Sequence, residues 1–144
     1  MRNLFAIGVV LLSGCMSPEM IKRQQDERDQ FMANRPVCLS ERQCEGMWAA
    51  ARNWVTASCG MKIQSITDSF IETYNDVGGT GRLACRVTKD PRPEGGYVFT
   101  VTTGCGNLFG CVPDAWQAAK DFNHTVKLEG GRFATSPVEV PVYQ

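Results

Sequence analysis

The chain contains seven cysteines, and thiols support disulfide formation, metal coordination and nucleophilic catalysis. Two pairs, Cys38 with Cys44 and Cys105 with Cys111, each enclose five residues. A structural zinc site needs ligand pairs about two to four residues apart or a mixture of cysteine and histidine, and the sequence offers neither. We therefore expect no metal and no cofactor, and the thiols remain candidates for disulfides.

The first cysteine follows an N-terminal leader. Arg2 precedes an apolar run over residues 4–12, and the small residues Ser13 and Gly14 come next. At about 1.5 Å per residue, a helix of this run is too short to cross a hydrocarbon core about 30 Å thick. A charged start, a short apolar stretch and small residues at the boundary are typical of a secretory signal peptide. We therefore exclude residues 1–14 from the fold.

The tetrapeptide Leu12-Ser13-Gly14-Cys15 resembles the lipobox of bacterial lipoproteins. The resemblance implies cleavage before Cys15, a diacylglycerol thioether on its sulfur and an N-acyl chain such as palmitate, which together anchor the chain in a membrane. In enteric bacteria, an Asp directly after the lipidated cysteine tends to retain a lipoprotein in the inner membrane. Residue 16 is Met. The resemblance therefore implies the outer membrane of the cell envelope, with the chain facing the periplasm.

Setting Cys15 aside leaves an even number of cysteines in a chain exported to an oxidising compartment, which predicts three disulfides. The six candidates are Cys38, Cys44, Cys59, Cys85, Cys105 and Cys111. Fifteen pairings are possible, and the sequence alone does not choose among them. The two pairs that enclose five residues favour small local loops. They would leave Cys59 and Cys85 as the long-range bond.

Other residue types that carry out catalysis are sparse. His124 is the single histidine, and helical spacing aligns it with Gln117 and Lys120 on a polar face, which favours a solvated side chain. Asp68 and Glu72 are spaced to share one side of a strand, as the facing carboxylates of a glycosidase require, but solvated strand faces show this spacing routinely. No serine lies in a Gly-x-Ser-x-Gly motif. We expect the protein not to be an enzyme.

Charge and length restrict the remaining classes of function. Without residues 1–14 the chain has 14 basic and 15 acidic residues, so it is almost neutral. Binding to nucleic acid or to an anionic lipid surface relies on clustered positive charge, and we expect neither as a partner. The length suits one small domain. We expect a signal peptide at 1–14, a lipidated N-terminus and polar tether at 15–36, a globular domain at 37–129 and a C-terminal tail at 130–144.

Two helices are expected in the first half of the mature chain. Ser17 followed by Pro18 predicts the start of a polar spacer helix, which Pro36 ends. A second helix is predicted from Glu41 to about Ser58, with Ser40 and Gln43 forming a capping box. Its apolar residues recur at intervals of three and four, which places them on one face. We expect Gly60 to supply a left-handed C-terminal cap.

A third helix is expected near the C-terminus. Pro113 suits its first turn, and the predicted helix runs to about Lys127. Val112 and Trp116 belong to its expected apolar face together with Ala115, Ala119, Phe122 and Val126. Gly130-Gly131 is expected to end it.

Three extended segments lie between the second and third helices. The apolar phase shifts within residues 61–74, which predicts a turn or bulge near Ser65 before a strand at Phe70 to Tyr74. Residues 82–88 and 97–102 alternate apolar and polar, as antiparallel strands with one buried face do. The expected register brings Leu83, Cys85 and Val87 opposite Val101, Phe99 and Tyr97.

The expected fold is therefore α+β. It is a small antiparallel sheet of about three strands with two helices on one face, in the order α-β-β-β-α. It is stapled by disulfides and preceded by the polar spacer helix.

One loop is the best candidate for function. If Cys105 and Cys111 are joined, the ring presents Leu108 and Phe109 between two glycines. Apolar side chains on a rigid ring form a contact site that loses little entropy on binding, and the hypothesis for function is that they bind a partner, another envelope protein. The expectation that we favour for the structure is that both side chains tuck under the sheet and close the core.

In size and style the domain resembles small bacterial lipoprotein domains of unassigned function. The resemblance implies a membrane-anchored envelope lipoprotein with a non-enzymatic structural, assembly or partner-binding role. The alternative is a periplasmic ligand-binding or enzymatic module, with a pocket between the sheet and the helices. The candidate pocket residues are Trp48, Trp54, Tyr97 and Trp116.

Overall fold

The computed structural model describes residues 17–134, which divide into two compact units at Met32 and Ala33. The predicted signal peptide and lipobox lie outside the described residues, as does the predicted tail beyond Ala134. Helix α1 (Pro18–Ala33) accounts for the first unit. Everything else described here belongs to the second unit.

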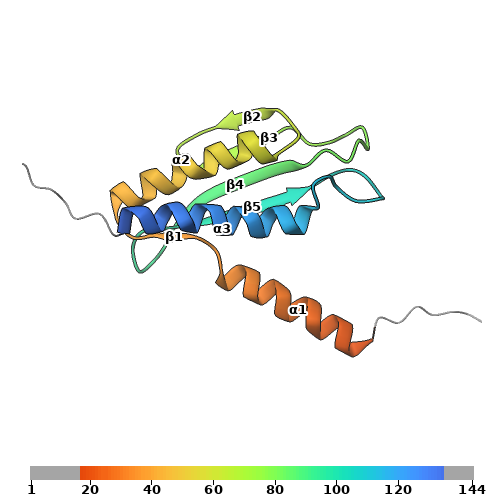
Figure 1. The fold of residues 1–144 in the computed structure, drawn as a ribbon, viewed down its shortest axis with the longest axis horizontal. Helices are drawn as coiled ribbons and strands as arrows, with labels where there is room; N and C mark the ends of the chain where they lie inside the picture. The colour runs from red at the N-terminus through yellow and green to blue at the C-terminus, as the bar shows by residue number, and fades with distance from the viewer. Residues whose placement is uncertain (1–16, 135–144) are drawn as a thin grey trace, which may run out of the picture. The chain divides into compact units, whose positions relative to one another are not determined.

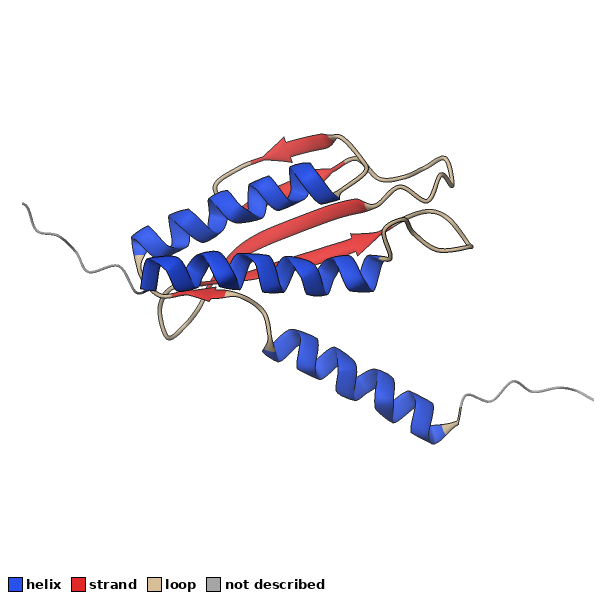
Figure 2. Cartoon of the chain, viewed as in Figure 1, coloured by secondary structure: helices blue, strands red, loops and turns tan. Residues whose placement is uncertain are grey.

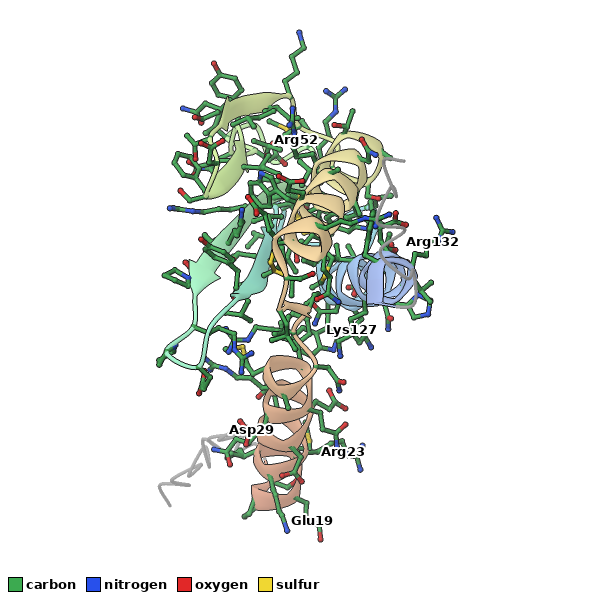
Figure 3. The ribbon with its side chains drawn as sticks, turned by 90° about the vertical axis from the view of Figure 1, so that its left-hand side faces the viewer. Glu19, Arg23, Asp29, Arg52, Lys127 and Arg132 are labelled. Atoms are coloured by element: carbon green, nitrogen blue, oxygen red, sulfur yellow. A yellow bond between two sulfur atoms is a disulfide. The ribbon has the colours of Figure 1, made fainter. Side chains whose placement is uncertain are left out.

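Helix α1 confirms the predicted polar helix. Ser17 precedes it and accepts hydrogen bonds from the backbone N–H of Met20 at its carbonyl, 3.0 Å, and at its hydroxyl, 3.3 Å. Every side chain of α1 is exposed except that of Phe31, which is half-buried. Charged side chains project along the helix, among them those of Glu19, Arg23 and Asp29 (Figure 3). Across residues 17–134, no helix is both long enough and apolar enough to span a membrane.

The second unit is a two-layer α+β domain. Its elements are β1 (Val37–Cys38), α2 (Glu41–Ser58), β2 (Ile63–Ile66), β3 (Phe70–Thr73), β4 (Ala84–Pro91), β5 (Tyr97–Gly104) and α3 (Ala115–Ala134). The strands form one antiparallel sheet in the order β1-β5-β4-β3-β2. Helices α2 and α3 pack side by side on one face of it (Figures 1 and 2). The α+β class is confirmed, but the sheet has five strands instead of three.

Two short elements account for the additional strands. Strand β1 has only two residues, too few for an alternating pattern to be read from sequence. The segment expected to give one strand forms the hairpin β2–β3, whose turn is closed by the hydroxyl of Thr67 accepting from the N–H groups of Ser69 and Phe70. The predicted irregularity near Ser65 is present, because the register of the hairpin shifts between Ile63 and Ser65.

The β4–β5 hairpin has a different register from the one expected. Val87 lies opposite Val101 instead of Tyr97, and the ladder continues to the pair Pro91 and Tyr97. A proline is tolerated at the end of a strand, where a missing N–H interrupts no further pairing. The connection is therefore shorter than predicted, and Gly95 and Gly96 close it with positive φ angles of 96° and 74°.

Helix α2 has the predicted bounds but a different C-terminal end. The hydroxyl of Ser40 accepts from the N–H of Gln43 at 3.3 Å, while the Gln43 side chain accepts from the N–H of Leu39 at 2.8 Å. The left-handed cap expected at Gly60 is wrong. Cys59 is extended, with φ −90° and ψ 128°, and φ is not positive at Gly60. The helix therefore ends where the chain turns to place Cys59 in a disulfide.

Helix α3 is longer than predicted at its C-terminal end and shorter at its start. It begins at Ala115, and the Asp114 carboxylate caps it by accepting from the N–H of Gln117 at 2.9 Å. The helix continues through Gly130-Gly131, so the expected end there is wrong. A Cβ at Gly130 would lie 2.6 Å from the sulfur of Met47 in α2. Gly130 therefore allows the two helices to approach closely.

The core fills the space between the sheet and the two helices. Its fully buried side chains include those of Phe99, Phe122, Met47, Ile71, Leu83, Val55, Val87 and Val126. The rings of Trp54 and Phe122 meet edge to face with centroids 5.2 Å apart. The indole N–H of Trp54 donates to the Asp121 carboxylate at 2.7 Å, so this buried polar group is satisfied.

Three disulfides staple the domain. They join Cys38 to Cys44, Cys59 to Cys85 and Cys105 to Cys111, with Cα–Cα distances of 5.0, 6.1 and 5.6 Å. This is the pairing favoured by the two spacings of five residues. The first bond fixes the start of α2 to β1, and the second fixes its end to β4.

Adjacent glycines in α3 allow a direct test of the helix contact. We expect Gly131→Ala to raise the free energy of unfolding by up to about 1 kcal/mol, because alanine favours a helix and no atom lies within 4 Å of the added Cβ. Gly130→Ala should leave the domain less stable than Gly131→Ala by about 1 to 3 kcal/mol, because Met47 must move. Urea unfolding of both variants measures the difference, and equal stabilities would contradict the packing role of Gly130.

Candidate functional site

Two loops project together at one end of the sheet (Figure 1). One covers residues 74–83 between β3 and β4, and the other covers residues 105–114 between β5 and α3. The N–H of Val112 donates to the carbonyl of Gly81 at 2.8 Å, and Arg82 forms a parallel bridge with Val112. We call these two loops the tip.

Close backbone approach holds the two loops of the tip together. A Cβ on Gly106 would overlap the carbonyl oxygen of Asp76, so only glycine fits there. Gly81 has a positive φ of 75° and lies against Asn107 and the carbonyl of Gly110. Packing therefore explains Gly106, and packing with backbone conformation explains Gly81.

The carboxylate of Asp76 organises the first loop. It is buried and accepts from the N–H groups of Gly78 at 3.2 Å and Gly81 at 3.0 Å. Burial alone would raise the pKa of Asp76. The backbone hydrogen bonds from Thr80, Gly78 and Gly81, with a side-chain hydrogen bond to Thr80, outweigh burial and hold the pKa below its ordinary value of 3.8. The negative charge of Asp76 therefore interacts with backbone N–H groups of its own loop.

The second loop is the disulfide ring expected from Cys105 and Cys111. Inside it, the side chain of Asn107 accepts from the N–H of Phe109 at 2.9 Å. Gly110 closes the turn in the left-handed region, with φ 104°. The expectation that Leu108 and Phe109 tuck under the sheet is wrong, because their exposed fractions are 100% and 99%.

Sequence reasoning missed two further apolar residues of the tip. Val77, on the first loop, is 96% exposed, and Val112, directly after the ring, is 80% exposed. The prediction that Val112 belongs to the apolar face of the third helix is wrong, because that helix starts three residues later, at Ala115. Val77 lies among glycines and polar residues, where no periodicity marks it. The tip therefore presents four exposed apolar side chains: Val77, Leu108, Phe109 and Val112.

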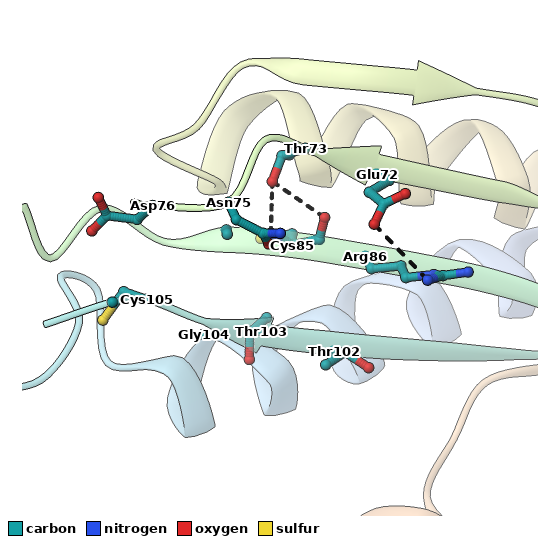
Figure 4. Close-up of a pocket in the computed structure, with 12 residues that line it drawn as sticks. Glu72, Thr73, Asn75, Asp76, Cys85, Arg86, Thr102, Thr103, Gly104 and Cys105 are labelled. Atoms are coloured by element: carbon teal, nitrogen blue, oxygen red, sulfur yellow. Dashed lines mark hydrogen bonds and ion pairs between the residues drawn. The ribbon is translucent and has the colours of Figure 1, made fainter. Parts of the chain in front are cut away.

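A hollow of about 350 Å³ lies behind the tip, at the loop ends of β3, β4 and β5 (Figure 4). Glu72 and Arg86 form an ion pair of 3.9 Å on its wall, and Asp76 belongs to the loop network. The hydroxyl of Thr73 accepts from the N–H of Cys85 at 2.9 Å and donates to its carbonyl at 3.3 Å. The ionisable side chains of this lining are thus already engaged with other groups of the protein.

The expected pocket between the sheet and the helices is filled at two of its three tryptophans, and the third, Trp116, is exposed. Trp48 and Trp54 are buried in contact with Phe99 and Phe122. A second hollow, of about 410 Å³, lies outside the core and is lined by Tyr97 and residues near the start of α2. The ammonium group of Lys89 lies 4.7 Å from the Tyr97 ring centroid, at the distance of a cation–π contact.

The remaining catalytic candidates do not form a constellation. His124 is exposed on α3. Asp68 lies in the β2–β3 turn, so it does not share a strand face with Glu72 in β3. Among residues 17–134, no three histidine, cysteine or acidic side chains are grouped to hold a metal ion.

The Asp76 network predicts a pH dependence. Because the folded-state pKa lies below 3.8, the carboxylate stabilises the domain above pH 3.8, and this stabilisation is lost as the pH falls through the folded-state value. Asp76→Asn should be less stable than the native chain at neutral pH, with a gap that narrows below pH 3.8. Urea unfolding across the acid range measures the gap, and a constant gap would show that the charge of Asp76 is unimportant.

The most distinctive feature of the described chain is therefore the apolar surface of the tip, held by one disulfide, one buried carboxylate and paired backbone. It exposes four apolar side chains, and the side-chain oxygens of Asp76 and Asn107 accept hydrogen bonds from N–H groups within the loops. In comparisons with known proteins, no family model, curated protein or solved structure matches the chain.

Proposed function

We propose that the protein is a lipid-anchored lipoprotein of the bacterial envelope with a non-enzymatic, partner-binding role. Its tip makes the contact. The observation that carries the proposal is the almost complete exposure of Leu108 and Phe109 on a disulfide-closed ring. Exposed apolar clusters of this kind are typical of interaction sites.

The backbone of the ring is restricted, which favours a role in binding a partner. The Cys105–Cys111 bond and the Asn107 turn restrict the backbone before any partner arrives. A contact surface that is already ordered loses less conformational entropy on association. Burying a leucine or phenylalanine side chain contributes about 1.5 to 3 kcal/mol to the free energy of association. Two or three such residues are therefore enough to stabilise a contact with a partner.

The proposed address rests on the N-terminal sequence. Leu12-Ser13-Gly14-Cys15 has the form of a lipobox, and Met16 favours the outer membrane over retention in the inner one. Three disulfides suit the oxidising periplasm. Residues 15–36 would be the tether, and a 16-residue helix within it, α1, extends for about 24 Å.

The alternative of a ligand-binding or enzymatic module has less support. The tryptophans expected to line its pocket include two, Trp48 and Trp54, that pack into the core. The hollow behind the tip has ionisable groups that are paired or hydrogen-bonded. A partner-binding role needs only the surface that the tip presents.

The contact role predicts a selective loss of binding. Phe109→Ser in the full chain should lower the amount of envelope protein that co-purifies with it by about tenfold or more, because most of the ring's aromatic contact area is lost. The domain should remain folded, because Phe109 is 99% exposed. Leu128→Ser is the matched control, since Leu128 is 59% exposed on α3, outside the tip. Equal co-purification by both variants would exclude the ring as the contact.

The anchor has its own test. Cys15→Ser should leave the chain unlipidated and lower its share in the membrane fraction, because the acyl chains supply the stable attachment. Mass spectrometry of the native N-terminal peptide should show acylated Cys15. An unmodified N-terminal Met, or a free thiol on Cys15, would contradict the anchoring proposal.

A further inference from the structure

The three disulfides of the domain differ in burial, and the Cys105–Cys111 bond of the ring is the one with two half-buried cysteines. A Cβ on Gly110, directly before Cys111, would meet no atom within 4 Å. The side chains of Leu108 and Phe109 are almost fully exposed, so they do not cover the bond. The ring bond is therefore accessible to a small nucleophile while the domain stays folded.

The Cys38–Cys44 bond has the same sequence separation, six positions, but a different environment. Cys38 is 0% exposed and Cys44 is 5% exposed. A disulfide is reduced when a thiolate attacks one of its sulfurs, so the rate depends on access to that sulfur. Reduction of Cys38–Cys44 therefore requires the start of α2 to move away from β1. Because the two rings are equal in size, burial distinguishes their reactivity.

The Cys59–Cys85 bond is protected through its leaving group. Cys59 is half-buried, whereas Cys85 is 3% exposed. Attack at Cys59 would release the sulfur of Cys85 as a thiolate inside the core, and apolar surroundings disfavour the charged form of a thiol. A poorer leaving group slows the exchange. Either sulfur of the ring bond, in contrast, leaves from a half-buried position.

We propose that Cys105–Cys111 is a redox-sensitive bond, and that its reduction by a dithiol protein frees the ring and weakens the contact made by the tip. The inference rests on the proposed function and adds its regulation. A thiolate of the reductant attacks one ring sulfur, a mixed disulfide forms, and the other sulfur leaves as a thiolate that takes up a proton. The second thiol of the reductant then attacks the mixed disulfide and releases the remaining cysteine. The ring gains two electrons and two protons, and the reductant becomes a disulfide.

The effect of reduction is confined to the ring by contacts at its two ends. Gly106 packs against the carbonyl of Asp76, and the N–H of Val112 donates to the carbonyl of Gly81. The apex of the ring lies between these contacts and contributes no side chain to the core. A freed ring must be ordered again when a partner binds, which lowers the affinity. The bond therefore controls the apolar side chains of the ring without control of the fold.

The kinetics of reduction of the full-length chain test the selectivity. The folded protein is incubated with dithiothreitol, quenched with iodoacetamide at intervals and digested, and mass spectrometry identifies the alkylated cysteines. We expect Cys105 and Cys111 to be alkylated about tenfold or more faster than Cys38 and Cys44, the buried pair with the same ring size. In denaturant the two rates should converge. Equal rates in the folded protein would overturn the proposal.

A second measurement tests the release of the ring without any partner. Nuclear magnetic resonance relaxation reports the backbone order parameters of residues 107–110 before and after selective reduction. We expect values of about 0.85 in the oxidised chain and below about 0.6 in the reduced chain, with β4 and α3 unchanged. Order parameters that stay the same after reduction would overturn the release.

A third measurement separates this regulation from the contact role itself. The double variant Cys105→Ser with Cys111→Ser, in the full chain, should lower the amount of co-purified envelope protein, as Phe109→Ser does. A loss with Phe109→Ser and none with the double variant would overturn the regulation and leave the contact role intact. If Phe109→Ser causes no loss, the proposed function fails, and the reduction rates still report the reactivity of the bond.

Discussion

The Cys59–Cys85 disulfide is the constraint on which the rest of the domain depends. It connects Cys59, the residue directly after α2, to β4 near the middle of the sheet, across 26 positions of sequence. The closed segment contains the β2–β3 hairpin and the first loop of the tip. In the chain-entropy description, a loop of this size contributes about 3 to 4 kcal/mol by restricting the unfolded chain. With Cys38–Cys44 at its other end, α2 is covalently fixed to the sheet at both ends.

This covalent frame explains how a small domain keeps an apolar tip exposed. The helices and sheet bury a compact core around Phe99 and Phe122, and the side chains of Leu108 and Phe109 contribute nothing to it. In a small domain, exposed apolar residues reduce the share of the chain available for burial. The disulfides offset that loss by restricting the unfolded chain. The Cys105–Cys111 bond also closes the ring that bears the exposed side chains of Leu108 and Phe109.

Sequence patterns predicted the elements that are specified locally. The caps at Ser40 and Ser17 depend on residues three positions away, and the ring depends on a spacing of five residues. Local sequence patterns do not predict features that depend on contacts between distant residues. The two-residue strand β1 exists because it pairs with β5, and Gly130 lies within α3 because it packs on Met47 of α2. A glycine in a helix has the same local signature whether it ends the helix or allows close packing.

The candidate site shows the same division between local and distant causes. The ring and its two apolar residues were visible in the sequence, but Val77 was not, because its exposure depends on the loop that the Asp76 carboxylate holds. The position of Val112 also depends on a distant contact. Its N–H donates to the carbonyl of Gly81 on the other loop, and the residue does not belong to the first turn of α3. Val112 therefore lies on the paired loops, where its side chain is 80% exposed. This pairing joins residues about 30 positions apart, so no local pattern in the sequence contains it.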